Sequence, residues 1–322
     1  MMNKRLKQGS TFLLAVALTF PLLTLPGAKA ANAIDTDAEC SIQFDIDGNS
    51  SELLSASIPV NLYKVASVDV SGNYTATGTF AKLDFSSVSA DNLDTAAATW
   101  SERAAEAKKL LKDDTEPTTT VTLTQGRGTA TGLKTGLYLV DTPEVVTTNY
   151  TYTFTPYLVS LPTNNYYSNG NDNWIYDLTK EYNSAVGLKP EEHARYGDLK
   201  INKTLAHHNA TTGKKATFVF KIEITPLKGK TETRIESLDF EAAGDSSVTI
   251  TKIPAGATVT VKEEYSGASY KLTSANDQNA TIVATDRGAK VDPASVSFTN
   301  DIDNNMNGGY GVKNNFKLDE NG

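Results

Sequence analysis

Apolar and polar residues alternate along most of the chain, which is the pattern of half-buried β-strands. In the first half this pattern predicts strands at residues 59–65, 120–123, 136–140 and 152–159. In the second half it predicts strands at residues 199–204, 217–225, 247–253, 258–263, 270–273, 281–285 and 295–299. The chain is therefore expected to be mainly β.

One segment, residues 94–112, breaks this alternation and predicts a helix. Alanine dominates the segment, and Asp94 stands where a helix N-cap is expected. Its apolar side chains recur at helical spacing on one face: Trp100, Ala104, Ala107 and Leu111. We expect a single helix packed on a sheet, with Trp100 as a core residue and not as a platform for a ligand.

The alternation stops at residues 184–196 and resumes at Gly197, which indicates a domain boundary. On both sides of this boundary the spacing of the strands suits antiparallel sandwiches. We therefore expect two tandem β-sandwich domains, at residues 31–190 and 191–322, the first with one inserted helix.

The N-terminus has the features of a secretory signal peptide at residues 1–30. Basic residues precede an uncharged run at 11–26, and Ala28-Lys29-Ala30 supplies small residues at the two cleavage-site positions. A membrane anchor is the weaker interpretation, because the run is short for a bilayer span and ends with Pro21 and Pro26. We expect an exported protein with no membrane span once this segment is removed.

Composition excludes several classes of function. The 322 residues include 30 basic and 38 acidic ones, a net charge of −8, so nucleic acid is not an expected partner. Three histidines and one cysteine leave few ligands for a metal site, and we expect neither metal nor cofactor. No hydrolase or phosphate-binding motif occurs, so no turnover enzyme is expected. Cys40 cannot form an internal disulfide, and its role stays open.

Three strands of the second half share a further pattern: inward apolar residues are followed by a polar residue of the same parity. These polar residues are Lys203, Glu263 and Asn300. Taken singly, each has an ordinary explanation: Lys203 snorkels to solvent at a strand end, Glu263 lies at the rim, and Asn300 opens a turn. Because burying an unpaired charge costs several kcal/mol, the matched parity of all three favours one shared site. Lys200 and Glu264 have the opposite parity and are second choices.

When an amine, a carboxamide and a carboxyl group lie in one core, the amine can replace the nitrogen of the carboxamide and form a new amide bond. Desolvation lowers the pKa of a lysine, and its neutral amine can attack the asparagine side chain while the glutamate carries protons. The product is an isopeptide bond, with ammonia as the leaving group.

At this point the sequence resembles the CnaB-like isopeptide-forming domains of Gram-positive pilins and surface adhesins. The matching segments are residues 197–204, 257–263 and 296–300. The resemblance implies two immunoglobulin-like sandwiches, with Lys203 as nucleophile, Asn300 as electrophile and Glu263 as catalytic acid. It also implies autocatalytic self-cross-linking without turnover.

The first half resembles the N-terminal domains of the same pilin-like proteins through residues 62–66, 135–140, 156–162 and 174–178. Lys64 shares a parity with the apolar residues before it, as does Asp141, so these two form a second candidate pair, with Asn183 as the nearest asparagine. In backbone pilins a sortase joins a lysine near the end of this domain to the next subunit. Here the candidates are Lys180 and Lys189, which depart from the Pro-Lys context usual there.

We therefore expect a structural protein of a Gram-positive cell surface, a pilin subunit or adhesin, whose partners are other pilin or surface subunits. Residues 317–322 carry no sortase motif, so we expect either an accessory subunit held by another chain or a released protein. The alternative is a secreted module that binds a host glycan or matrix protein through loops such as residues 164–173.

Overall fold

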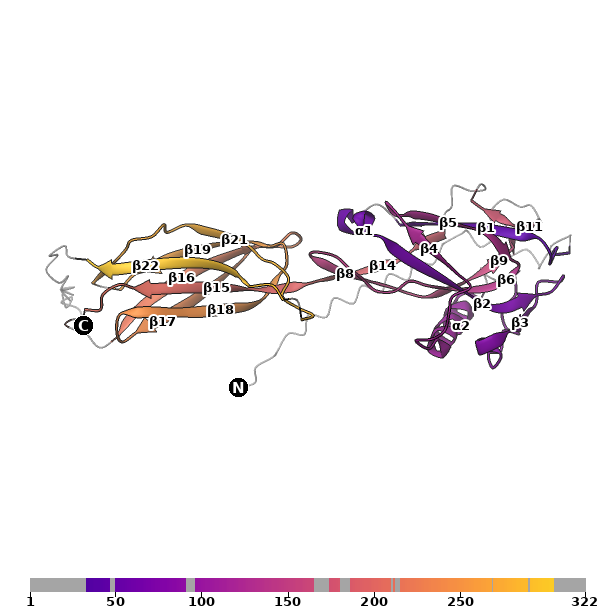
Figure 1. Cartoon of the computed structure of the whole chain (residues 1–322), viewed down its shortest axis with the longest axis horizontal. Coiled ribbons are helices and arrows are strands. Elements are labelled where there is room, and N and C mark those ends of the chain that lie inside the picture. The colour runs from indigo at the N-terminus through magenta and orange to yellow at the C-terminus, as the bar shows by residue number, and fades with distance from the viewer. Residues whose placement is uncertain are drawn as a thin grey trace, which may run out of the picture.

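The computed structural model is mainly β, and two sandwiches follow one another along its long axis (Figure 1). It describes residues 33–46, 50–90, 96–164, 174–179, 186–209, 211, 215–267, 269–288 and 290–303. The signal peptide expected at residues 1–30 lies outside these ranges. Two tandem sandwiches with a helix in the first confirm the expected fold class.

The first sandwich packs two main sheets against each other. One contains β1 (Glu39–Ile46), β5 (Arg127–Lys134), β12 (Asp177–Leu178) and β13 (Val186–Leu188). The other contains β2 (Ile58–Val68), β3 (Tyr74–Ala76), β4 (Thr119–Leu123), β6 (Gly136–Asp141) and β9 (Tyr157–Leu161). Inward side chains of β1, β2, β4 and β6 form the core between these sheets.

Smaller elements complete this sandwich. They are α1 (Ser51–Ser55), a 3-10 turn at Gly78–Phe80, β7 (Val145–Val146), β8 (Tyr150–Phe154), β10 (Thr163–Asn164), β11 (Trp174–Ile175) and β14 (Pro190–Ala194). The single strand expected at 152–159 is thus two strands, β8 and β9. The strand β14 pairs with β8 and therefore still belongs to the first sandwich.

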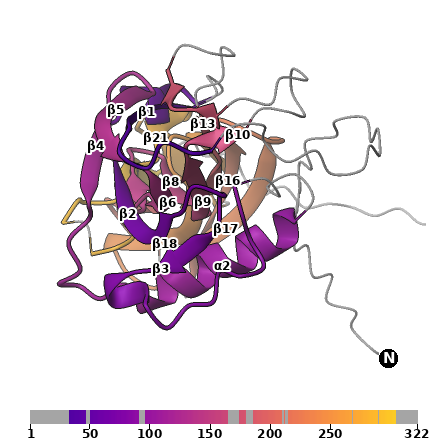
Figure 2. The same ribbon diagram turned by 90° about the vertical axis from the view of Figure 1, so that its right-hand side faces the viewer.

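The expected helix is α2 (Ala97–Leu110), which lies on the outside of the first sandwich (Figure 2). Trp100, Ala104 and Ala107 are buried against the outer face of the β2–β6–β9 sheet, where they form a second core. The helix is shorter than the expected 94–112: it begins after the N-cap residue Ala96, whose side chain makes no capping hydrogen bond, and it ends before Leu111. Asp94 lies outside the described residues.

The second sandwich has two four-stranded sheets. One has the order β18 (Gly244–Pro254), β15 (Tyr196–Leu205), β22 (Ala294–Ile302) and β20 (Tyr270–Leu272). The facing sheet has the order β17 (Glu232–Phe240), β16 (Ala216–Thr225), β19 (Thr258–Tyr265) and β21 (Gln278–Thr281). The strands β15 and β22 pair in parallel, and apolar side chains of both sheets fill the core. The strand β17 was not expected from the sequence, and β21 begins three residues before the strand expected there.

Arg195 alone separates β14 from β15, and it ties the two sandwiches together. Its backbone N–H donates to the carbonyl oxygen of Asn149 and its own carbonyl accepts from the N–H of Ala255, both at 2.9 Å. Its guanidinium donates to the carbonyl of Thr147 at 2.7 Å and to Oδ1 of Asp286 at 2.8 and 3.0 Å. One residue therefore bonds to both domains through both its backbone and its side chain.

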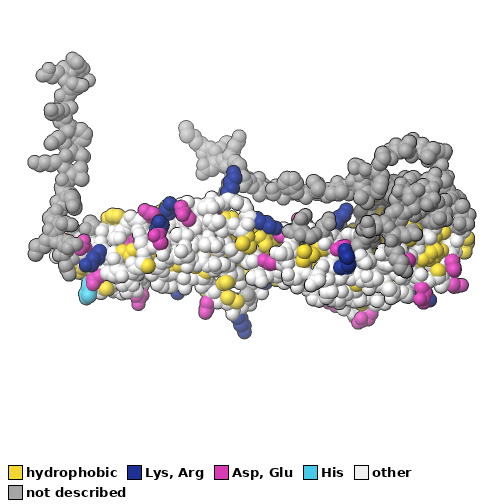
Figure 3. Space-filling view, turned by 90° about the horizontal axis from the view of Figure 1, so that it is seen from above, with side chains coloured by type: hydrophobic (Ala, Val, Ile, Leu, Met, Phe, Trp, Pro, Cys, Tyr) yellow, Lys and Arg dark blue, Asp and Glu magenta, His cyan; other side chains and the backbone are white. Residues whose placement is uncertain are grey.

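Charged side chains of both signs lie interspersed along the face shown in Figure 3. Among the helices that the structure describes, none is long and apolar enough to cross a membrane.

Candidate cross-linking site

The strands of the second sandwich bring Lys203, Glu263 and Asn300 into its core. In β15, β19 and β22 every second residue is buried, and each of these three residues continues the buried series of its strand. Lys203 and Asn300 lie on neighbouring parallel strands, where Lys203 is opposite Phe298 and Asn300 is opposite Leu205. Glu263 reaches them from the facing sheet.

The three side chains contact one another directly. The Nζ of Lys203 donates to Oε2 of Glu263 at 2.6 Å and also to Oδ1 of Asn300. The Nδ2 of Asn300 donates to Oε1 of Glu263, also at 2.6 Å. The carboxylate thus holds the amine on one oxygen and the amide nitrogen on the other. The Lys203 and Glu263 side chains are 0 % exposed, so the contacts form away from solvent.

Two aromatic rings line the amine of Lys203. Its Nζ lies 4.4 Å from the ring centroid of Phe218 and 5.9 Å from that of Phe220. Burial in these surroundings lowers the pKa of Lys203, and the hydrogen bond to Glu263 opposes this shift only in part. At a given pH, a larger fraction of the Lys203 amine is therefore neutral than in a lysine exposed to water. These two rings were not predicted as part of the site, although both continue the inward alternation of β16.

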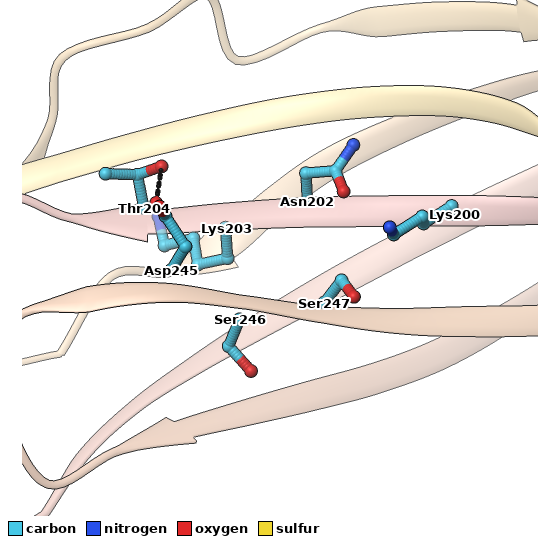
Figure 4. Close-up of a pocket in the computed structure, with 7 residues that line it drawn as sticks. All are labelled: Lys200, Asn202, Lys203, Thr204, Asp245, Ser246 and Ser247. Carbon is cyan, nitrogen blue, oxygen red and sulfur yellow. Dashed lines mark hydrogen bonds between the residues drawn. The ribbon is translucent and has the colours of Figure 1, made fainter.

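The second choices, Lys200 and Glu264, lie outside this core. Glu264 is exposed. Lys200 is on the outer face of β15, where it lines a shallow groove together with residues of β18 (Figure 4). The Oγ1 of Thr204 donates to Asp245 there at 2.6 Å. Lys203 also lines this groove, although its Nζ is directed into the core, where it contacts Glu263 and Asn300.

The expected pairing of Lys64 with Asp141 is wrong. Lys64 in β2 lies opposite Tyr138 in β6, and Tyr138 belongs to the core between the sheets. Residues opposite each other in an antiparallel pair share a face. Leu137 and Leu139, which have the parity of Asp141, belong instead to the core under α2. Lys64 and Asp141 therefore point to opposite faces of the sheet.

The Asp141 carboxylate is paired instead with the Nζ of Lys108 from α2. Asn183 and Lys180 lie outside the described residues. Lys189 is exposed between β13 and β14. The loop at 164–173 considered for ligand binding lies outside the described residues from position 165 onward.

Cys40 is a core residue of the first sandwich and is 0 % exposed. Burial raises the pKa of its thiol to about 11, an effect that the nearby Lys64 only partly offsets. The thiol is therefore protonated and a poor nucleophile at neutral pH. Cys40 therefore serves as an apolar packing residue in this core.

A family model described as "Domain of unknown function (DUF5979)" matches residues 199–303, which contain all three residues of the site. No curated protein matches the chain.

Similar solved structures include GBS52, a minor pilin of Streptococcus agalactiae, at 14% identity and a TM-score of 0.24, covering 82% of this chain and 96% of that one. The major pilin SpaA of Corynebacterium diphtheriae aligns at 10% identity and a TM-score of 0.23, covering 81% and 100%. The TIE protein of Bacillus anthracis aligns at 12% identity and a TM-score of 0.31, covering 82% of this chain and 34% of that one.

Proposed function

We propose that this chain is an extracellular structural subunit of the pilin type, and that its second sandwich closes an amide bond between Lys203 and Asn300 with Glu263 as the proton carrier. The observation that carries this proposal is the mutual contact of the three side chains in a core closed to bulk solvent.

The proposed reaction is an amide exchange whose atoms balance without a cofactor. Lys203 gives a proton to Oε2 of Glu263, 2.6 Å away, and its neutral Nζ attacks Cγ of Asn300. The new N–C bond forms as the bond from Cγ to Nδ2 breaks. Nδ2 takes a proton through Oε1 of Glu263, 2.6 Å away, and leaves as ammonia. The amine of Lys203 gives up two protons in all: one reaches Nδ2 through Glu263, and the second leaves Glu263 with the ammonia as ammonium, which returns Glu263 to its carboxylate form.

The geometry supports this reaction over a purely structural ion pair. A buried lysine–glutamate pair contributes little net stability, because the cost of desolvating two charges offsets their attraction. Such a pair also needs no third partner. Here the amide of Asn300 completes the set, with its nitrogen on the carboxylate and its oxygen on the amine. Reacting groups held in contact gain a large kinetic advantage over groups that must meet by diffusion.

The subunit role rests on less specific features. The chain is acidic, its first 30 residues have the pattern of a signal peptide, and its two sandwiches stand end to end in an elongated molecule (Figure 1). In this proposal further pilin or surface subunits are its partners. Lys189 is exposed and thus accessible to a sortase, and it is the attachment point that we propose to test first.

Intact mass spectrometry of the purified full chain tests the cross-link. We expect a mass one ammonia below that calculated from the sequence, and a proteolytic fragment that joins the peptides of Lys203 and Asn300. The variant Lys203→Ala should lack the deficit. Lys200→Ala removes a lysine from the outer face of the same strand and should retain it. A wild-type chain of full calculated mass would refute the proposed bond.

A further inference from the structure

The segment of residues 273–278 crosses between the two sheets beside the proposed site. It leaves β20, which pairs with β22, and enters β21, which pairs with β19. The strands β22 and β19 carry Asn300 and Glu263. One short segment therefore joins the strand that pairs with the Asn300 strand to the strand that pairs with the Glu263 strand.

On the β22 side, this segment binds the backbone of the residues that precede Asn300. Thr273 donates from its backbone N–H to the carbonyl of Thr299 at 2.8 Å, and Ser274 Oγ accepts from the N–H of Thr299 at 3.1 Å. The side chain of Gln278 accepts from the N–H of Ser297 at 3.0 Å and also donates to the carbonyl of Ser297. The backbone that leads to the amide of Asn300 is thus fixed before that residue.

On the β19 side, one side chain holds the backbone of Glu263. The β19–β21 ladder ends at Val261 and Gln278, two residues before Glu263. Beyond that point Oδ1 of Asn276 accepts the N–H of Glu263 at 2.8 Å. The other neighbour, β16, has a register shift here, since Val219 lies opposite Tyr265 and Phe220 opposite Glu263. A bulge loosens the local ladder, so the backbone of Glu263 depends more on this side-chain acceptor.

We propose that Asn276 is a positioning residue for the cross-linking reaction: its side chain sets the backbone of Glu263, and the 273–278 segment thereby fixes the carboxylate relative to Asn300. This inference rests on the proposed function. Asn276 is exposed and acts through the backbone of Glu263. Its contribution is to geometry, because a carboxylate displaced by a fraction of an ångström no longer serves the amine and the leaving nitrogen equally.

The test is the rate of ammonia loss by the full chain, followed by intact mass spectrometry during cell-free synthesis. Replacing the acceptor with Asn276→Ala should slow the reaction by about tenfold. Asn276→Asp keeps an acceptor oxygen at the same distance and should restore the rate to within about twofold of wild type. Asn279→Ala is the matched control, since Asn279 accepts a hydrogen bond from Thr260 of the same strand β19 and does not contact Glu263.

Equal rates for wild type and Asn276→Ala would overturn the proposal, as would an Asn276→Asp chain as slow as Asn276→Ala. If Asn276→Ala yields little folded chain, Asn276→Gln replaces it, because the longer side chain keeps the amide but displaces its oxygen, and the same slowing is expected. A wild-type chain that never loses ammonia would refute the proposed function itself. A wild-type chain that reacts at the rate of every variant would refute only the role of Asn276.

Discussion

Replacing Glu263 with glutamine is the sharpest perturbation of the proposed reaction. Glutamine has nearly the same shape, so the space between Lys203 and Asn300 stays filled. It cannot, however, take a proton from the amine at Oε2 or deliver one to the amide nitrogen at Oε1. The variant Glu263→Gln should therefore fold with Lys203 and Asn300 in place but without the bond between them.

The size of the effect follows from the chain length that the bond encloses. Lys203 and Asn300 are 97 positions apart. If loop-closure entropy in the unfolded chain is treated as it is for a disulfide, a cross-link of this span stabilises the second sandwich by about 4.7 kcal/mol. For a domain of this size, that corresponds to a fall of about 20 °C in the midpoint of its thermal unfolding when the bond is absent.

Differential scanning calorimetry of the full chain, paired with intact mass spectrometry, measures both consequences. The expected result for Glu263→Gln is the full calculated mass and a second-sandwich transition about 20 °C lower than in wild type. Lys200→Ala, which changes the outer face only, should keep the mass deficit and shift the transition little. A Glu263→Gln chain that has lost ammonia would refute the role of Glu263. A chain that lacks the bond but unfolds at the wild-type temperature would refute the entropic argument.

Three further predictions concern the amine of Lys203, the thiol of Cys40 and the junction at Arg195. In Asn300→Ala the amine of Lys203 cannot form the amide bond and titrates with a pKa lowered from 10.5. Because the unfolded state then binds more protons than the folded state, the free energy of unfolding should rise as the pH approaches 10.5. Urea titrations at several pH values should show this rise in the variant and not in cross-linked wild type. Cys40 should react with a disulfide reagent at least about 100-fold more slowly in the folded chain than in urea, because burial raises its pKa from 9.0 to about 11; equal rates would contradict its burial. Arg195→Ala should weaken the junction between the sandwiches by about 1.5–3 kcal/mol and broaden the range of domain orientations seen in small-angle X-ray scattering. Arg287→Ala, which removes an exposed ion pair with Glu144, should leave that range nearly unchanged.

Alternation along single strands was enough to find the residues of the core site. Lys203, Glu263 and Asn300 each extend a run of inward apolar residues by one step, and side-chain parity within a strand follows from backbone geometry alone. The helix containing Trp100 was found for a similar reason, since its apolar face repeats at helical spacing. Signals carried by one strand or helix were therefore readable in the sequence.

Relations between strands were not readable in the same way. The pairing of Lys64 with Asp141 failed because which residues share a face depends on register, and β2 and β6 also shift register between Lys64 and Ala66. The strand β17 was missed because it has few fully buried residues and many charged ones. Asn276 was missed because its hydrogen bond to Glu263 lies beyond the end of a ladder, where no periodicity marks it.

The parallel pairing of β15 with β22 also determines how the second sandwich would respond to a pull along its length. Tension between the first sandwich and residue 303 enters at the start of β15 and leaves at the end of β22, so it shears their whole ladder at once. With Lys203 and Asn300 bonded, that force bypasses residues 204–299, which would otherwise add about 330 Å of extended chain. Single-molecule stretching should show this added length for Asn300→Ala and not for wild type. The domain would then act as a link of nearly fixed length.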